Sequence, residues 1–292
     1  MKPPPFAYVD PATVPDALAI LAEHGEDGKI LAGGQSLVPL LNMRLAAPRT
    51  LIDLNRIPDL RYVSRRDREG VAGLAIGAMT RQRAVEDDAG ALASLPMLRD
   101  AIAWVGHPQI RNRGTIGGSI AHADPAAELP LVFRALDGIA TVRSRRGDRE
   151  IPAADFFAYA FTPALEPDEL LAEVWFPLPG PHSGQAFLEV ARRHGDFALV
   201  AAAAAVTLQD RLLTDIRIAI GGAAPTPLRA AGAEAALNGQ RPALALFREA
   251  GRIAATETDP TADIHADAAY RREVAGTLVT RALTLAWERC GS

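Results

Sequence analysis

Apolar residues in the first third of the chain follow two spacings, one typical of a helix and one typical of short strands. Four apolar residues recur at helical spacing: Val14, Ala17, Leu18 and Leu21. Gly25 and Gly28 follow them and are expected to end this helix. Short apolar runs predict three strands, at 29–32, 50–54 and 74–78. Residues 36–44 predict one or two helical turns, and Thr80 is the expected N-cap of a helix over 81–88.

The middle of the chain combines helical stripes with a glycine-rich interval. Leucine, isoleucine and valine at helical spacing predict a helix over 92–105, and a second helix is expected over 126–136. Between these helices, residues 106–125 are rich in glycine and polar residues. Two further strands are expected, at 139–142 and 170–176. Three prolines and a glycine within 177–181 indicate a domain boundary.

Beyond this boundary the pattern changes to long apolar strands followed by helices. The expected strands are 185–193, 198–208 and 212–220. The expected helices are 227–237, 243–257 and 270–289. This order predicts an antiparallel sheet with helices, and the whole chain therefore reads as α+β. A length of 292 residues agrees with about two domains.

Composition excludes several classes of function. The net charge of −4 provides no global basic field for nucleic acid. The longest apolar stretch, 197–206, is short of the ~20 residues of a membrane span. The N-terminus has no apolar region typical of a secretory signal, so a cytoplasmic protein is expected. Cys290 is the one cysteine, which excludes a disulfide framework, a thiolate zinc site and an iron–sulfur cluster. The six histidines show no metal-binding spacing, so no metal site is expected.

Two glycine-rich segments carry the candidate chemistry. The first is Ala32-Gly33-Gly34-Gln35-Ser36-Leu37, and the second is Thr115-Ile116-Gly117-Gly118-Ser119. Paired glycines let backbone N–H groups approach an anion, and the hydroxyl residues add side-chain donors. Two such segments suit a pyrophosphate held from both sides, although each also fits a simple tight turn. Neither matches the Rossmann or P-loop fingerprint, and no nucleophile elbow is present.

Eight stretches, in order along the chain, resemble the FAD-binding medium subunits of molybdenum hydroxylases. That family includes the carbon monoxide dehydrogenase medium chain and the flavin domain of xanthine dehydrogenase. The stretches are LAGGQSLVPLLNMRLAAPR at 31–49, TLIDLNRI at 50–57, IGAMT at 76–80, PQIRNRGTIGGSIAHADPAAELP at 108–130, YAFT at 159–162, EPDELL at 166–171, RRHGDFA at 192–198 and HADAAYRR at 265–272.

The resemblance implies an α+β fold of the vanillyl-alcohol-oxidase type with FAD between two domains. It implies a PCMH-type FAD-binding domain over 1–177, with subdomains of about 1–57 and 58–177. A carbon monoxide dehydrogenase flavoprotein-like C-terminal domain would follow over 182–289. Residues 32–36 and 115–119 would then bind the pyrophosphate of FAD. Many relatives carry His where this chain has Gln35, a change that leaves backbone contacts possible.

Two further residues are candidates for contact with FAD. The Asp124 carboxylate suits the ribityl or ribose hydroxyls, and it suits equally the N-cap of the 126–136 helix with Pro125 at its first position. Phe197 occupies the place where relatives often have an aromatic residue near the flavin, where a ring could stack on one face. Its alternative is a place in the core.

Several neighbouring residues have two open interpretations. Arg111 and Arg113 flank the second glycine segment. They could neutralise the charge of a phosphate, or they could face solvent or a partner protein. Arg192 and Arg193 could place positive charge near the flavin N1–C2=O edge, or they could be exposed on the surface. Trp104 is expected in the core.

The resemblance also implies the function and the partners. Substrate would be oxidised on a large molybdopterin-binding subunit, and electrons would pass through a small [2Fe–2S] subunit to FAD on this chain. FAD would then deliver them to an external acceptor, so no catalytic side chain is expected. A dimer of heterotrimers is the implied assembly. The alternatives are a stand-alone flavin oxidoreductase of the same fold and an assembly module that has lost its flavin.

Overall fold

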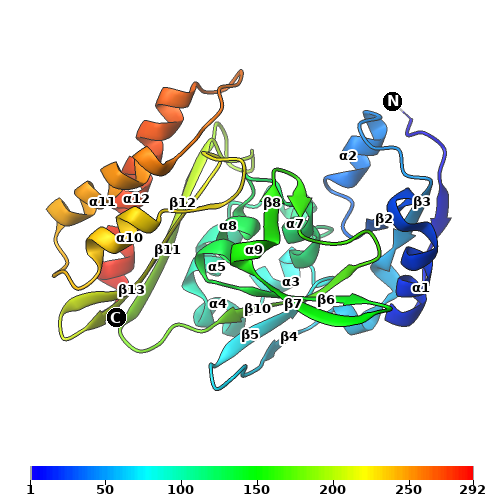
Figure 1. Cartoon of the computed structure of the whole chain (residues 1–292), viewed down its shortest axis with the longest axis horizontal. Coiled ribbons are helices and arrows are strands. Elements are labelled where there is room, and N and C mark those ends of the chain that lie inside the picture. Colours follow the sequence, from blue (N-terminus) through cyan, green and yellow to red (C-terminus); the bar gives the residue numbers. More distant parts are fainter. Residues whose placement is uncertain (1, 292) are drawn as a thin grey trace.

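The computed structural model describes residues 2–291, which form three sheets and a short β-ribbon (Figure 1). The N-terminal part is a three-stranded parallel sheet in the order β1-β3-β2. Its elements are β1 (Ala7–Val9), α1 (Val14–His24), η1 (Gly25–Asp27), β2 (Gly28–Leu31), α2 (Leu37–Asn42), β3 (Thr50–Asp53), η2 (Leu54–Arg56) and η3 (Pro58–Leu60). The Thr13 side chain accepts from the Asp16 amide to start α1, and Gly25, at φ +51°, ends it. The helix predicted from apolar spacing is confirmed.

A five-stranded antiparallel sheet, in the order β4-β5-β10-β6-β7, forms the centre of the molecule. Its strands are β4 (Val63–Arg65), β5 (Gly73–Gly77), β6 (Ile139–Ser144), β7 (Gly147–Pro152) and β10 (Leu170–Pro177). The accompanying elements are α3 (Gln82–Glu86), α4 (Ala89–Ser94), α5 (Pro96–Ile102), α6 (Pro108–Arg111), α7 (Ile116–His122), α8 (Glu128–Ala135), α9 (Ala153–Phe156) and the ribbon β8 (Phe157–Tyr159) with β9 (Thr162–Pro163). Phe133 is fully buried and contacts Phe156 and Phe176 edge-on at the centre of this core.

The C-terminal part is an antiparallel sheet covered by helices, as predicted, but the sheet has a fourth strand at 228–229, within the range 227–237 that was expected to be helical. The strands, in spatial order, are β11 (Ser183–Val190), β12 (Val200–Gln209), β13 (Leu212–Gly221) and β14 (Leu228–Arg229). The helices are α10 (Ala231–Leu237), α11 (Leu244–Glu257) and α12 (Ala268–Arg289). Figure 1 shows these helices on the face of the sheet that is turned away from the five-stranded sheet. Among the described residues, none of the helices combines the length and the apolar character of a membrane span.

The alanine run in β12 faces both ways. Ala201, Ala203 and Ala205 belong to the core that contains Phe133, whereas Ala202 and Ala204 belong to the core beneath α11 and α12. Alternation of side chains along a strand explains this division. Small side chains on both faces allow helices to pack closely against the sheet from both sides.

Two local predictions around α3, α4 and α5 were wrong. Residues 92–105 are not one helix, because Pro96 begins α5 and holds Leu95 in an extended conformation, at φ −131° and ψ 82°, between α4 and α5. Thr80 does not cap α3, whose N-cap is Arg81 without a side-chain bond. The Thr80 hydroxyl instead bonds both the amide and the carbonyl of Tyr62, at 3.0 and 2.9 Å.

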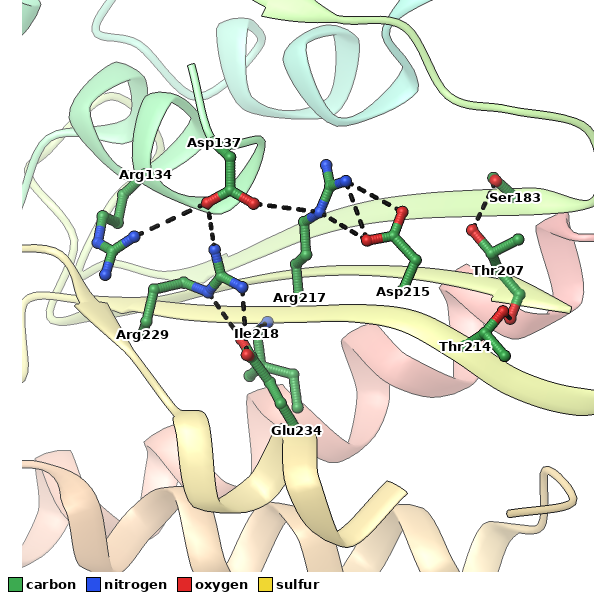
Figure 2. A network of polar contacts seen from close by, with 10 residues as sticks. All are labelled: Arg134, Asp137, Ser183, Thr207, Thr214, Asp215, Arg217, Ile218, Arg229 and Glu234. Carbon is green, nitrogen blue, oxygen red and sulfur yellow. Dashed lines mark hydrogen bonds and ion pairs between the residues drawn. The ribbon is translucent and has the colours of Figure 1, made fainter. Parts of the chain in front are cut away.

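An ion-pair network joins the end of α8 to the four-stranded sheet (Figure 2). Asp137 has φ +51° and lies within 3.8 Å of Arg134, 3.2 Å of Arg217 and 2.5 Å of Arg229. Glu234 of α10 accepts from the Arg229 Nε at 2.7 Å and from the Ile218 amide at 2.7 Å. The network therefore fixes the C-terminal end of α8 against β13 and α10.

Candidate functional site

The first glycine segment is an open turn between β2 and α2. Gly34 has φ +74°, a conformation that favours glycine, and its carbonyl accepts from the Val38 amide at 3.0 Å to begin α2. Within residues 2–291, the amides of Gly34, Gln35 and Ser36 have no acceptor. Ser36 precedes α2 without a side-chain capping bond, and Leu37 is the first residue of that helix. Successive unpaired N–H groups beside a left-handed residue form a concave site for an anion.

The second glycine segment is the beginning of α7 rather than a free loop. Thr115 is the N-cap, and its hydroxyl accepts from the Gly118 amide at 3.0 Å. The Ile116 amide donates to the Thr80 carbonyl at 3.0 Å, and the Gly117 amide donates to the Ala78 carbonyl at 2.9 Å. The first three amides of α7 are therefore occupied by the protein itself.

The two glycine segments touch, as their predicted shared role requires. A Cβ on Gly33 would lie 2.5 Å from the carbonyl oxygen of Arg113. A Cβ on Gly118 would lie 3.2 Å from the Cβ of Ala32. Both distances are too short for an ordinary side chain to enter without movement. Glycine is thus required at position 33, where the backbone of the first segment passes the backbone of residues 113–114, whereas at Gly118 the contact with Ala32 is tight.

A polar network that sequence reasoning missed supports this junction. Arg81 donates to the Arg113 carbonyl and, at 2.5 Å, to the Asn55 Oδ1. The Asn55 amide group donates to the Ala32 carbonyl at 2.9 Å and to Asp53 Oδ1 at 2.6 Å. Asn55 lies in TLIDLNRI and Arg81 directly follows IGAMT, so the stretches that carry the family resemblance were the available signal.

The junction is positively charged. Burial lowers the pKa of Arg81, and the nearby charges of Arg113 and Arg61 lower it further. Behind it, Tyr8 donates to Asp53 Oδ2 at 2.6 Å, and this hydrogen bond is the main reason that the pKa of Tyr8 rises to about 12. Arginine side chains at the junction and unpaired amides in the first segment are both groups suited to phosphate oxygens.

Arg111, in contrast, is not available to phosphate. It is buried and holds Glu86 with two bonds of 2.8 and 2.9 Å, and it also donates to the Val105 carbonyl at 2.9 Å. The hydrogen bond from Arg111 holds the pKa of Glu86 below its usual range. Arg111 therefore fastens α6 to α3, and its interpretation as a phosphate ligand was wrong.

Asp124 lies in the turn after α7 and does not cap α8. Its Oδ1 accepts from the Ala126 amide at 2.9 Å, but α8 begins only at Glu128, with Ala127 as the N-cap. The helix expected from residue 126, with Pro125 at its first position, was therefore placed too early. Asp124 is 9% exposed, and burial raises the pKa of its carboxyl.

The end of α7 presents two further groups. His122 is half-buried, and its ring centroid lies 5.2 Å from that of Phe161, whose side chain is 57% exposed. Burial lowers the pKa of His122. Ser119, one turn earlier on α7, is also half-buried.

Phe197 lies in the turn between β11 and β12 and is 62% exposed, so its alternative place in the core is wrong. The same turn rests on the segment before α6. A Cβ on Gly195 would lie 2.6 Å from His107 Cε1, and the Trp104 and His194 rings meet edge-on at 5.1 Å. Trp104 is half-buried at this contact and packs against the core of the five-stranded sheet. The turn therefore packs, through His194 and Gly195, against the segment that leads into the second glycine segment, and Phe197 lies two residues beyond Gly195.

Arg192 and Arg193 are both exposed. Arg192 approaches His265 Nδ1 at 3.0 Å, so two of the stretches that carry the resemblance meet in space.

The site as a whole provides binding groups rather than an acid–base pair. Among residues 2–291, no cluster of three or more His, Cys, Asp or Glu side chains is arranged to hold a metal ion. The unpaired amides, the arginines and the required glycines fit the pyrophosphate of a dinucleotide. FAD is therefore compatible with the residues present.

Comparison with known proteins supports the same ligand. Residues 4–179 match the FAD binding domain in molybdopterin dehydrogenase, and residues 185–286 match the CO dehydrogenase flavoprotein C-terminal domain. The 6-hydroxypseudooxynicotine dehydrogenase complex subunit alpha of Paenarthrobacter nicotinovorans is 43% identical, covering 99% of this chain and 97% of that protein. The carbon monoxide dehydrogenase medium chain of Hydrogenophaga pseudoflava is 37% identical, covering 99% and 100%.

The fold agrees with these relatives. A solved structure of carbon monoxide dehydrogenase from Hydrogenophaga pseudoflava superposes with a TM-score of 0.95 at 38% identity, covering 99% of this chain and 100% of that one. Both family models and both relatives together span nearly the whole sequence. The chain therefore belongs to the family of FAD-binding subunits of molybdenum hydroxylases, with an FAD-binding domain followed by a CO dehydrogenase flavoprotein C-terminal domain.

Proposed function

We propose that this chain carries FAD in a heteromeric molybdenum hydroxylase and passes electrons through it to an external acceptor. The observation that carries the proposal is the row of three unpaired amides at 34–36, directly after Ala32 and Gly33, which lie against the start of α7. This junction lies within the part of the chain that matches the FAD-binding family. Bound FAD would supply the redox chemistry, and the protein would fix its position.

The residues that we propose to contact FAD lie on both glycine segments, after α7 and in the β11–β12 turn. They are Ala32, Gly33, Gly34, Gln35, Ser36, Leu37, Thr115, Ile116, Gly117, Gly118, Ser119, Asp124 and Phe197. The amides of 34–36 would donate to pyrophosphate oxygens. Gln35 would act through its backbone, because its side chain donates to the Gly33 carbonyl at 3.0 Å. Asp124 would bond a ribityl or ribose hydroxyl, and Phe197 would cover one face of the flavin ring.

We further propose a division of the chain at 177–181, with FAD-binding subdomains of about 1–57 and 58–177 and a C-terminal domain over 182–289. Three observations support it. The parallel sheet lies within the first subdomain, the five-stranded sheet within the second, and the four-stranded sheet within the C-terminal domain.

The proposed partners are a large molybdopterin-binding subunit and a small [2Fe–2S] subunit, in a cytoplasmic dimer of heterotrimers. The sequence has one cysteine, the buried Cys290, and a [2Fe–2S] cluster needs several ligands. These 292 residues cannot ligate such a cluster, and we propose that the clusters lie on the small subunit. The names of the two relatives refer to different substrates, carbon monoxide and 6-hydroxypseudooxynicotine. We infer that the large subunit selects the substrate.

A pair of glycine variants tests the cofactor site. Gly34 and Gly239 have φ of +74° and +73°, and no atom lies within 4 Å of a Cβ on Gly239. Ala at either position imposes a similar backbone strain, about 1 kcal/mol, and at Gly34 the methyl group also lies 3.1 Å from Val38 Cγ2. We expect Gly34→Ala to lose bound FAD, measured by visible absorbance and FAD titration, while Gly239→Ala retains it.

Two outcomes would contradict the proposal. Equal FAD binding by the two variants would show that the 34–36 amides do not hold the cofactor. A wild-type chain that takes up no FAD, alone or with its partners, would contradict the function itself. Reduction of bound FAD by a small organic substrate without any partner would favour the stand-alone oxidoreductase.

A further inference from the structure

The turn that joins β11 to β12 carries the exposed Phe197 on a backbone with several fixed points. The Leu199 amide donates to the Val190 carbonyl at 2.8 Å and closes the base of the turn. On the β11 side, Arg192 lies 3.0 Å from His265 Nδ1, in the loop before α12. A phenylalanine exposed to solvent is therefore presented by an ordered turn.

Arg271, near the start of α12, binds the base of this turn. It is buried, at 7% exposed, and its Nη1 donates to the Leu199 carbonyl at 2.5 Å and to the Gly222 carbonyl at 3.2 Å. Its Nη2 donates to Asp263 Oδ2 at 2.7 Å, and this carboxylate balances the buried charge. One guanidinium thus joins three segments that are distant in sequence: the start of β12, the end of β13 and the loop before α12.

Gly222 connects this arrangement to the FAD-binding domain. Its amide donates at 2.8 Å to the carbonyl of Pro125, which directly follows Asp124. Gly222 has φ +73°, and a Cβ on it would lie 2.7 Å from the Leu199 carbonyl oxygen. The backbones that carry Phe197 and Asp124, both proposed to contact FAD, are therefore fixed to one another through Gly222.

The guanidinium of Arg271 is held in this place at a cost. Its Nε is buried and has no hydrogen-bond partner among residues 2–291, and an unpaired buried donor is destabilising. An apolar side chain would fill the same space without this cost. The gain from Arg271 therefore comes from the two carbonyls that it joins rather than from the space that it fills.

We propose that Arg271 is a positioning residue that fixes the β11–β12 turn so that Phe197 lies against the flavin ring. This inference rests on the proposed function, in which Phe197 covers one face of that ring. A stacking contact contributes most when the protein side is ordered before the ligand binds, because ordering a mobile turn on binding consumes part of the gain. Arg271 therefore acts on the flavin end of FAD, whereas the amides of 34–36 act on its pyrophosphate.

The first test needs no flavin. Hydrogen exchange of the full-length chain, read by mass spectrometry, is compared between wild type, Arg271→Gln and Arg272→Gln. Arg272 is the next residue of α12 and is exposed, so its variant is the matched control. Arg271→Gln is expected to exchange faster over 190–200 and 220–224, and Arg272→Gln is expected to match wild type. Equal exchange in all three proteins, or a rise spread evenly over the chain, would overturn the local role of Arg271.

The second test separates the flavin end of FAD from its diphosphate. ADP contains the adenosine diphosphate part of FAD but has no flavin ring. Arg271→Gln is expected to weaken FAD binding about tenfold and to leave ADP binding, measured by calorimetry, unchanged. Arg271→Lys keeps the charge and a donor and is expected to recover part of the FAD affinity. A loss of equal size for FAD and ADP would show a general structural role and overturn the proposal.

A double-mutant cycle with Phe197→Ala decides whether Arg271 acts through Phe197. In the Phe197→Ala background, Arg271→Gln is expected to cause no further loss of FAD affinity and no further change in the visible spectrum of bound flavin. A full additional loss would overturn the inference. A wild-type chain that binds no FAD would contradict the proposed function instead, and the exchange result would still decide whether Arg271 fixes the turn.

Discussion

The two glycine-rich segments are alike in sequence but differ in what their backbones do. In the first, the amides of 34–36 have no acceptor within the described chain. In the second, the amides of 116–118 all donate to protein oxygens. Paired glycines therefore serve two separate needs here. One pair leaves N–H groups open to a ligand, and the other lets a helix begin against its neighbours.

The reasons for glycine differ accordingly. Gly34 is required by its backbone conformation, φ +74°. Gly117 is required by space, because its Cβ would lie 2.4 Å from the Cβ of Ala78. Substitutions in the first segment should therefore act mainly on FAD affinity, whereas those in the second should act first on stability and, through it, on the FAD contacts proposed there. Three variants test this division.

Gly117→Ala is expected to have the largest effect. The added methyl group meets the backbone of Ala78, 2.9 Å from its carbonyl oxygen, and must separate α7 from β5. We expect the free energy of unfolding to fall by about 2–3 kcal/mol in urea denaturation. Gly90→Ala in α4 is the control, since its nearest neighbour is a side-chain oxygen at 3.3 Å, and it should be neutral or slightly stabilising. If Gly117→Ala left the free energy of unfolding unchanged, the difference drawn between the two glycine segments would be wrong.

Arg81→Gln is expected to lower both FAD affinity and stability. Arg81 donates to the Arg113 carbonyl beside the second segment and, through Asn55, supports the first segment. Loss of its charge-assisted bonds should weaken FAD binding roughly tenfold, equivalent to about 1.4 kcal/mol. Fluorescence titration with FAD measures this change. Arg83→Gln, which removes exposed ion pairs within α3, is the control and should bind FAD normally. If Arg81→Gln and wild type bound FAD with equal affinity, Arg81 would have no part in supporting the FAD site.

Thr115→Ala is expected to have the smallest effect. It removes the hydroxyl that accepts from the Gly118 amide, and loss of such a cap costs about 1 kcal/mol of stability. Thr115→Ser keeps the hydroxyl and should restore stability, as measured by thermal unfolding. If Thr115→Ala instead lost FAD at unchanged stability, binding FAD rather than starting α7 would be the main role of the hydroxyl.

Sequence periodicity located the long elements well and the short polar ones poorly. The stripe at 14–21 predicted α1, and the apolar runs predicted β12 and β13, because burial on one or both faces leaves a clear pattern. β7 was not predicted, because five of its six residues are exposed and its sequence, GDREIP, is largely polar. The break between α4 and α5 was readable from Pro96, but the apolar stripe continues across it.

The candidate site was partly predictable. The glycine segments were visible and their contact followed from the family resemblance, but their difference was not. Whether an amide is free depends on partners distant in sequence, such as the carbonyls of Ala78 and Thr80. For the same reason the sequence could not reveal that Arg111 is bonded to Glu86, or that the Glu189 carboxyl has no hydrogen-bond partner among residues 2–291.

The alternating alanines of β12 have a consequence for how the chain unfolds. One strand supplies methyl groups to both cores, so that neither core can open without weakening the other. The two parts of the molecule are therefore thermodynamically coupled and should melt in one transition rather than in succession. Cutting the chain at 177–181 and separating the two parts would expose the methyl groups of Ala201, Ala203 and Ala205 to water. The exposed apolar face of the sheet would then promote aggregation.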